Sequence, residues 1–346
     1  MKKIKIIYEK AYAESISCKS LIDGLVKEIK KRRISYEQTN DVKRILHKES
    51  VCIIGASYCW IEEVVKKCNA VGNVPLVLGS FLDKAVAGEY HRVCPDLDDV
   101  AKNLNFAFAE ADRTRVALYG GNSMVDIDRE RVDIFAKLIS QEVDVYPNTG
   151  SLAYCFESFY PKAVLYDAVI CVNGYAAVSL AKNLEKKNPA LLKKLIIVSC
   201  EEVLKNSKYD KISLVDMNLD SYGPVSLAIL EMASCREDIS SITAKIKADL
   251  CKIKKKDMRD YDIEKYQLYE DPEIVSMTKI EQLFRDADDM DHHIIALLLS
   301  NAKYSDISNT CYMTEGNVKY RVKKYMNICR CKTKKELIDL LQEYLQ

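Results

Sequence analysis

Strand-like and helix-like patterns alternate along the first 215 residues of this chain, and this alternation restricts its fold more than any other feature. Val51–Ala56 is a continuous apolar run, as expected of a parallel strand buried on both faces. Ser17–Lys31 before it places Leu21, Leu25 and Ile29 on one helical face. Further strands are predicted at Lys3–Tyr8, Pro75–Gly79, Arg115–Tyr119, Val143–Tyr146, Asp167–Val172, Lys194–Cys200 and Lys211–Met217. Alternation of this kind predicts an α/β fold with doubly wound, mainly parallel sheets.

The alternating pattern falls into two halves, which predict two lobes within residues 1–251. Lobe 1 is expected to comprise about residues 1–90 and 216–240, and lobe 2 about residues 91–215.

The character of the sequence changes after residue 251. Residues 252–288 are dense in charge and tyrosine and predict an exposed linker, in which Pro272–Arg285 could form a short helix. Residues 289–346 carry apolar residues at helical spacing and predict a small all-α domain. Its last helix is expected to begin at Lys334, because Thr333 and Glu336 have the spacing of a capping box.

The bulk composition excludes several classes of protein. The 346 residues are 48% apolar with a net charge of +1, which is typical of a globular chain. No stretch approaches the roughly 18 apolar residues of a membrane span, and the apolar run after Lys3 is too short for a signal peptide, so we expect a cytoplasmic protein. The 13 cysteines are scattered without CxxC spacing, and we expect reduced thiols and neither a metal nor a cofactor.

A cationic segment lies near the C-terminus. Eight lysines and arginines and no acidic residue lie between Gly316 and Lys335. From His292 onward the net charge is +4, whereas the rest of the chain carries −3. Such a segment on a slightly acidic protein is an electrostatic footprint for phosphate. A solvated helix face without a partner would carry the same charges, but the short helix, tight turn and apolar seam around it favour DNA binding.

The predicted helix Glu315–Met326 has two faces. Val318 and Val322 recur at helical spacing and are expected to face the core. Asn317 and Arg321 share another face, as side chains that read base edges must. The residues predicted to contact DNA are Thr314, Asn317, Lys319, Tyr320, Arg321, Lys323 and Lys324.

The stretch Ile307–Val322, which contains the letters MTEGNVK, resembles the LuxR-type helix-turn-helix. That family favours Ser-Glu-Gly-Thr-Val-Lys at the start of its recognition helix, and Lys332–Leu337 resembles the opening of the family's last helix. Asn317, Ala302 and Ser308 stand where the family usually has Thr, Gly and Ala, so the base preference stays open. The resemblance implies a DNA-binding domain at residues 289–346.

The first 250 residues resemble the periplasmic-binding-protein-like sensor domain of the lactose-repressor family in the order of their elements. Thr114–Gly121 is similar to the strand before that family's second-lobe cleft, and Ala168–Asn173 to its penultimate-strand signature. Ile196–Glu201 is similar to its Val-Gly-Tyr-Asp strand end, and Arg131 with Phe135 to its Arg-x-x-Gly-aromatic phrase. The resemblance implies a two-lobed sensor of type I.

In such a fold the ligand lies at the carboxyl ends of the parallel strands. Candidate ligand-binding residues in the loops after those strands are Tyr8, Glu9, Tyr12, Ser57, Trp60, Asn122, Arg131, Asn173 and Glu201. Arg131 is the favoured candidate, because its planar guanidinium can hold a carboxylate or hydroxyl groups. A surface ion pair would also account for an arginine at this position, and core packing would account for Trp60. Gly174 and Glu201 stand where the family has the Asp residues that hold sugar hydroxyls, which disfavours a typical sugar ligand. We expect a small polar effector, sugar-like or related.

These features together predict a transcription regulator that binds double-stranded DNA as a homodimer and responds to a small-molecule effector. An enzyme is disfavoured, because the chain has no GxSxG, GxGxxG, P-loop lysine or HExxH. A receiver domain is disfavoured, because Glu9 stands alone where a receiver needs an acidic pair. The alternative is an α/β small-molecule-binding protein or enzyme whose C-terminal helices mediate protein interaction. The two interpretations are distinguished by measuring whether affinity for DNA falls with salt.

Overall fold

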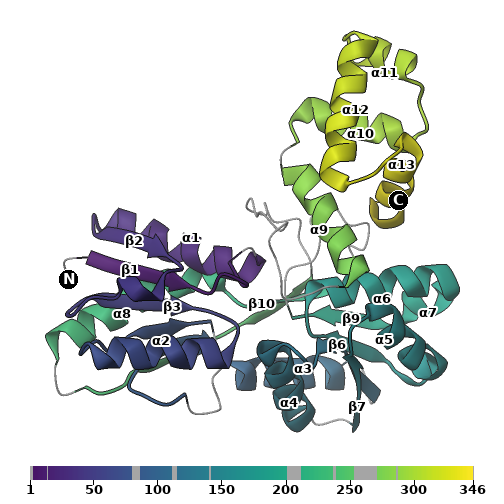
Figure 1. The fold of residues 1–346 in the computed structure, drawn as a ribbon. Coiled ribbons are helices and arrows are strands. Elements are labelled where there is room, and N and C mark those ends of the chain that lie inside the picture. The colour runs from purple at the N-terminus through teal and green to yellow at the C-terminus, as the bar shows by residue number, and fades with distance from the viewer. Residues whose placement is uncertain are drawn as a thin grey trace.

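The computed structural model describes most residues of the chain. These are 3–13, 15–79, 86–110, 115–139, 142–200, 212–236, 239–252, 271–285 and 287–345. Within them the chain forms two six-stranded sheets, each covered by helices, and a group of C-terminal helices that stands beyond the second sheet (Figure 1).

The first sheet forms lobe 1, with the strand order β11-β5-β4-β3-β1-β2 and parallel pairing throughout. Its strands are β1 (Lys3–Tyr8), β2 (Ser35–Thr39), β3 (Ser50–Ile54), β4 (Leu76–Leu78), β5 (His91–Pro95) and β11 (Thr243–Ile246). Its helices are α1 (Ile16–Lys31), η1 (Val42–Arg44), α2 (Tyr58–Ala70), η3 (Leu219–Ser221) and α8 (Tyr222–Cys235). In β3, Val51 and Ile53 face α2, whereas Cys52 and Ile54 pack with α1 and α8. Both faces are therefore buried, as the continuous apolar run predicts.

The second sheet forms lobe 2, with the order β12-β10-β9-β8-β6-β7, and β12 is antiparallel to β10. Its strands are β6 (Arg115–Asn122), β7 (Glu142–Asn148), β8 (Ala168–Cys171), β9 (Ile196–Ser199), β10 (Ser213–Asp216) and β12 (Asp249–Lys252). Its helices are α3 (Leu97–Glu110), α4 (Asp126–Leu138), α5 (Leu152–Phe159), η2 (Tyr160–Leu165), α6 (Gly174–Lys187) and α7 (Pro189–Lys194). α3 and α4 cover one face with Phe108 and Phe135, and α5 and α6 cover the other with Phe159 and Leu180. The predicted two-lobed α/β fold is confirmed.

The lobe boundaries differ from those expected. β5 and β11 belong to the first sheet, so lobe 1 extends past residues 90 and 240, and β12 returns the chain to lobe 2. The sequence pattern misses β11 and β2 because both are partly exposed edge strands without a continuous apolar run. The described chain therefore crosses between the lobes after β5, after β10 and after β11.

Among the described residues, five helices follow the lobes, and we call residues 271–345 the C-terminal module. They are α9 (Pro272–Arg285), α10 (Asp289–Leu299), α11 (Tyr304–Thr310), α12 (Glu315–Cys329) and α13 (Lys334–Leu345). α9 lies where the sequence allows a short helix, but it is not part of an exposed linker: Ile274, Met277 and Ile280 are buried in the same cluster as α6 and α12. Residues 253–270 of the predicted linker lie outside the described residues.

Two further findings concern the described residues. None of their helices combines the length and the apolar character needed to cross a membrane. Their cysteines are free thiols, most of them buried, and burial raises the pKa of Cys52 and of Cys68 to about 12. These thiols therefore act as small apolar side chains in the core.

Candidate functional site

The turn between α11 and α12 is well defined by its own hydrogen bonds. The Met313 N–H donates to the Ser308 carbonyl at 3.0 Å, and Tyr312 between them has a left-handed backbone with φ of 52°. Thr314 caps α12: its hydroxyl accepts from the Asn317 N–H at 3.3 Å. The Tyr312 side chain is 97% exposed. The turn therefore holds the first residues of α12 at the surface.

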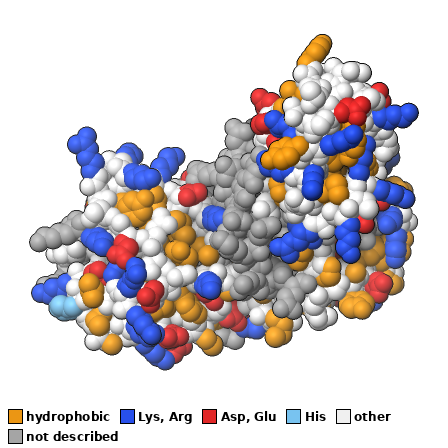
Figure 2. Space-filling model, turned by 45° about the horizontal axis from the view of Figure 1, so that its top comes forward, with side chains coloured by type: hydrophobic (Ala, Val, Ile, Leu, Met, Phe, Trp, Pro, Cys, Tyr) orange, Lys and Arg blue, Asp and Glu red, His pale blue; other side chains and the backbone are white. Residues whose placement is uncertain are grey.

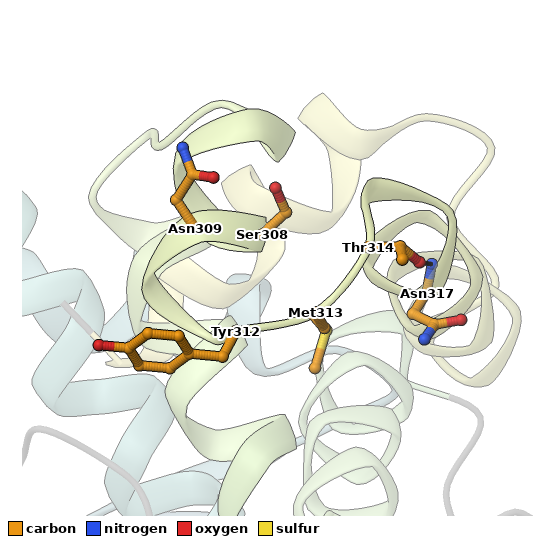
Figure 3. A pocket seen from close by; sticks show the side chains of 6 residues that line it. All are labelled: Ser308, Asn309, Tyr312, Met313, Thr314 and Asn317. Carbon is orange, nitrogen blue, oxygen red and sulfur yellow. Dashed lines mark hydrogen bonds between the residues drawn. The ribbon is translucent and has the colours of Figure 1, made fainter.

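A shallow hollow lies between α11 and the start of α12 (Figure 3). In Figure 3, Ser308 and Asn309 project from α11, and Thr314 and Asn317 lie across the hollow from them. The side chains that line the hollow are Ser308, Asn309, Tyr312, Met313, Thr314 and Asn317. Most of them carry hydrogen-bonding groups, so this surface can contact a polar partner.

The apolar seam of α12 is buried as predicted. Val318, Val322, Tyr325 and Cys329 are buried against α9, α10, α11 and α13. Burial of this seam turns the opposite face of α12 toward solvent.

The residues predicted to contact DNA on the other face of α12 are exposed, apart from Arg321. They are Thr314, Asn317, Lys319, Tyr320, Lys323 and Lys324. Lys319 forms an exposed ion pair with Glu315 at 3.3 Å, a kind of contact that contributes only about 0–1 kcal/mol. Figure 2 shows that blue lysine and arginine side chains are more frequent than red acidic ones over the C-terminal helices. This face is therefore cationic and accessible.

Arg321 departs from the expectation that it points outward. Its guanidinium donates to both Asp288 oxygens at 3.0 Å and also to Asp291, and the Tyr325 hydroxyl donates to the same Asp291 carboxylate. Asp288 and Asp291 form the capping box of α10, so Arg321 ties α12 to the start of α10. Hydrogen bonds to these acids raise the pKa of Arg321. The sequence does not reveal this role, because both acids lie far upstream of the basic segment, and we therefore assign Arg321 no base contact.

In lobe 1, the predicted ligand-binding residues hold the loop between β3 and α2. The Glu9 carboxylate accepts from the Ala56 N–H at 2.8 Å, from the Ser57 N–H at 3.0 Å and from the Ser57 hydroxyl. Trp60 lies against Gly55, where an added Cβ would come within 2.6 Å of its ring. Glu9, Ser57 and Trp60 are therefore brought together, and their contacts explain the shape of this loop.

In lobe 2, three of the predicted residues lie close to the carboxylate of Asp128, which no sequence pattern marked. The Asp128 carboxylate accepts from the Asn122 N–H at 3.1 Å and from the Asn173 amide at 3.3 Å. Asn173 also caps α6 by accepting from the Ala176 N–H at 3.0 Å. Arg131, one turn after Asp128 on α4, donates to the Val172 carbonyl at 3.1 Å. All four side chains are buried, so lobe 2 presents a compact polar cluster.

Tyr222 begins α8, at the crossover from lobe 2 into lobe 1, and no sequence pattern marked it as a candidate site residue. It is 1% exposed, and its hydroxyl has no hydrogen-bond partner among the described residues. Burial raises the pKa of Tyr222, Cys94 and Tyr12 act in the same direction, and Arg131 opposes them. Tyr222 and Tyr12 belong to the same buried cluster, which contains residues of both lobes.

The lobes also touch directly. The Tyr58 N–H at the start of α2 donates to the Asp126 carboxylate at the start of α4, at 3.0 Å. Tyr8 ends β1 half-buried, whereas Tyr12 is buried in the loop that follows. Glu201 lies outside the described residues. We call the buried residues Tyr12 and Tyr222 of lobe 1 and Asn122, Asp128, Arg131 and Asn173 of lobe 2 the interlobe cluster. Glu9 and Ser57 instead hold the loop between β3 and α2.

No protein-family model and no curated protein matches this sequence. Solved structures do match. The regulator CelR in complex with cellobiose has 11% identity and a TM-score of 0.58 over 72% of this chain and 82% of its own. The Lac repressor bound to ONPG has 11% identity and a TM-score of 0.57 over 73% of this chain and 81% of its own. GanP, a glucose-galactose binding protein from Geobacillus stearothermophilus, has 13% identity and a TM-score of 0.57 over 75% of this chain and 99% of its own.

The matched share is close to the share of the chain that precedes residue 253. The identities are too low to transfer an activity, but TM-scores of 0.57 to 0.58 over 72–75% of this chain show a shared fold. The two lobes of this chain have the type I fold found in LacI-type regulators and in a sugar-binding protein.

Proposed function

We propose that this protein is a cytoplasmic one-component transcription regulator, in which the lobes sense a small polar metabolite and the C-terminal module binds double-stranded DNA as part of a homodimer. The observation that carries the proposal is the outward face of α12: Asn317, Lys323 and Lys324 are exposed while the apolar seam is buried. A two-lobed domain of the LacI-regulator fold precedes it in the same chain.

α12 has the dimensions and chemistry of a helix that enters the major groove. Its 15 residues span about 22 Å, and Asn side chains can pair with adenine while Lys side chains bind guanine or phosphate. Thr314 and the backbone N–H groups at the start of α12 can contact a phosphate. The α11–turn–α12 arrangement and the MTEGNVK stretch both support a LuxR-type helix-turn-helix.

The interlobe cluster favours a ligand rich in hydroxyl groups. Asp128 supplies acceptor oxygens, Arg131 supplies a planar set of donors, and the Tyr222 hydroxyl can both donate and accept. A buried hydroxyl without a partner costs free energy, which a ligand hydroxyl would recover. We therefore propose a sugar-like or related polar effector.

Effector binding would control DNA binding through movement of the lobes. A ligand that binds one arrangement of the lobes more tightly shifts the population toward it, by no more than that difference in affinity. The change would alter the spacing of two α12 helices in a dimer.

The test selects bound sequences from a pool of random DNA duplexes and measures affinity for the best sequence at several salt concentrations. We expect enrichment of a DNA sequence made of two half-sites. We also expect an affinity that falls steeply with salt, because each phosphate contact releases counterions. Absence of enrichment together with an affinity indifferent to salt would sink the proposal and favour a protein-interaction module.

A further inference from the structure

Helix α6 links the interlobe cluster to the C-terminal module. Its N-cap is Asn173, whose amide donates to Asp128 in the cluster. Lys182 lies nine residues further along α6, which corresponds to about 14 Å of helix. One rigid element therefore contacts both candidate sites.

Lys182 contacts the first and the last helix of the C-terminal module at once. Its ammonium pairs with Glu273 in the first turn of α9 and with Glu343 in the last turn of α13, the latter at 3.0 Å. It also donates to the Tyr344 hydroxyl at 3.3 Å and lies 4.9 Å from the centre of that ring. The Lys182 side chain is only 14% exposed and that of Glu273 13%, so this contact is largely shielded from water and salt.

Other contacts fix the same end of α9. The Ser179 hydroxyl donates to the Glu273 carboxylate at 2.7 Å, one turn before Lys182 on α6. Asp271, directly before α9, accepts from the Leu152 N–H at the start of α5 at 2.6 Å. Lobe 2 thus holds the beginning of α9 by hydrogen bonds from two of its helices.

Lobe 2 and the C-terminal module also share one apolar core. Met277 and Ile280 of α9 belong to the same buried cluster as Leu180 and Leu184 of α6. Figure 1 shows α9 rising from α6 to the remaining C-terminal helices. A common core of this kind resists bending between the two parts.

We propose that Lys182 is a positioning residue that clasps the C-terminal module to lobe 2, so that the two move as one body when the lobes shift. This clasp, the contact of Lys182 with α9 and α13, does not depend on the proposed function. Its consequence for DNA binding, that α12 moves together with lobe 2, rests on the proposed function. Loss of Lys182 leaves the buried Glu273 without its ammonium partner, which favours separation of α9 from α6.

The test measures the distance between lobe 2 and the C-terminal module by electron spin resonance on the full chain. Nitroxide labels are attached at Glu157→Cys on α5 and Ala296→Cys on α10, two exposed positions, and Cys59, Cys235, Cys251 and Cys331 are replaced by serine. The parent chain is expected to give a single narrow distance peak. Lys182→Met should broaden this peak, and Lys182→Glu should abolish it, because the glutamate would face Glu273 and Glu343.

The matched control is Lys193→Glu, which changes an exposed lysine of α7 by the same charge and should leave the peak narrow. If Lys182→Glu fails to fold, as judged by circular dichroism, Lys182→Met remains informative. The double variant Lys182→Glu/Glu273→Lys should restore a narrow peak, which a general loss of stability would not allow.

A broad peak in the parent chain, or a peak in Lys182→Met as narrow as in the parent, would overturn the clasp. Failure of the proposed function is a separate outcome: the parent chain would then fail to bind DNA while its distance peak still responded to Lys182.

Discussion

The interlobe cluster and the outer face of α12 use polar side chains in opposite ways. In the cluster, Asp128 and Asn173 are buried and bonded to each other or to the backbone. On α12, Asn317, Lys323 and Lys324 are exposed. Buried polar groups maintain a fixed shape that a specific ligand can match, whereas exposed charges remain available to a partner and sensitive to salt. A substitution in the interlobe cluster should therefore change the stability of the fold. A substitution on the exposed face of α12 should change the affinity for a partner.

Arg321 is the strongest expected exception to this division. It belongs to the basic segment of the sequence, but its side chain forms ion pairs within the C-terminal module. Arg321→Met should lower the free energy of unfolding by about 2–3 kcal/mol, somewhat less than for a fully buried pair, because Arg321 is 29% exposed. Asp291, only 3% exposed, would lose its cationic partner and keep only neutral donors such as the Tyr325 hydroxyl. Chemical denaturation measures the change, and Lys323→Met is the control that should stay within about 0.5 kcal/mol of the parent. Equal stability of the two variants would contradict the structural role of Arg321.

Glu9 of lobe 1 tests whether a buried polar side chain contributes to stability. Glu9→Leu should cost about 2 kcal/mol, because the Ala56 and Ser57 N–H groups would lose their acceptor. Glu9→Gln should cost less, since the amide oxygen can still accept both bonds. Thermal unfolding compares them with Glu63→Gln, an exposed acid on α2, whose midpoint should not move. If Glu9→Leu is as stable as the parent, the loop does not depend on this carboxylate.

Lys323 and Lys324 test the exposed side. Replacing each by alanine should leave stability within about 0.5 kcal/mol of the parent. The slope of log affinity for DNA against log salt should become shallower by about 0.9 for each phosphate that the variant no longer neutralises. Fluorescence anisotropy with a labelled duplex measures the slope. Lys193→Ala on lobe 2 is the control and should leave it unchanged; an unaltered slope in the α12 variants would show that α12 does not touch the DNA.

The smallest expected effect is a pH dependence of lobe 1. Burial lowers the pKa of His91 from 6.5, and its neutral ring accepts from the Ile242 N–H at 3.1 Å. Below about pH 6.5 the unfolded chain therefore binds more protons than the folded one, and stability should fall as the pH drops. Urea unfolding between neutral and mildly acid pH measures the slope, which should flatten in His91→Asn. A parent slope unaffected by that substitution would show that other groups cause it.

Elements defined by contiguous residues were predictable. The apolar run at Val51–Ala56 contains most of β3, the spacing of Val318 and Val322 marks the buried seam of α12, and Thr314, directly before that helix, caps it. Each of these features depends on neighbours within a few positions in the chain, so periodicity and capping patterns reveal it.

Features that depend on distant partners were not predictable. Asp128 has no local signal, and Tyr222 enters the cluster only because the chain crosses back to lobe 1 at that point. The edge strand β11 pairs with β5, about 150 residues away, although its own residues alternate between exposed and half-buried.

By itself the sequence determined the alternating α/β lobes, the helical C-terminus and its cationic segment, because local apolar spacing and charge are properties of the chain. Only the tertiary structure decided that Arg321 points inward, that Asp128 and Tyr222 join the interlobe cluster, and that Lys182 holds α9 against lobe 2. The physical reason is that the partner of a charged or buried polar group is chosen by folding, which brings together residues that are far apart in the chain.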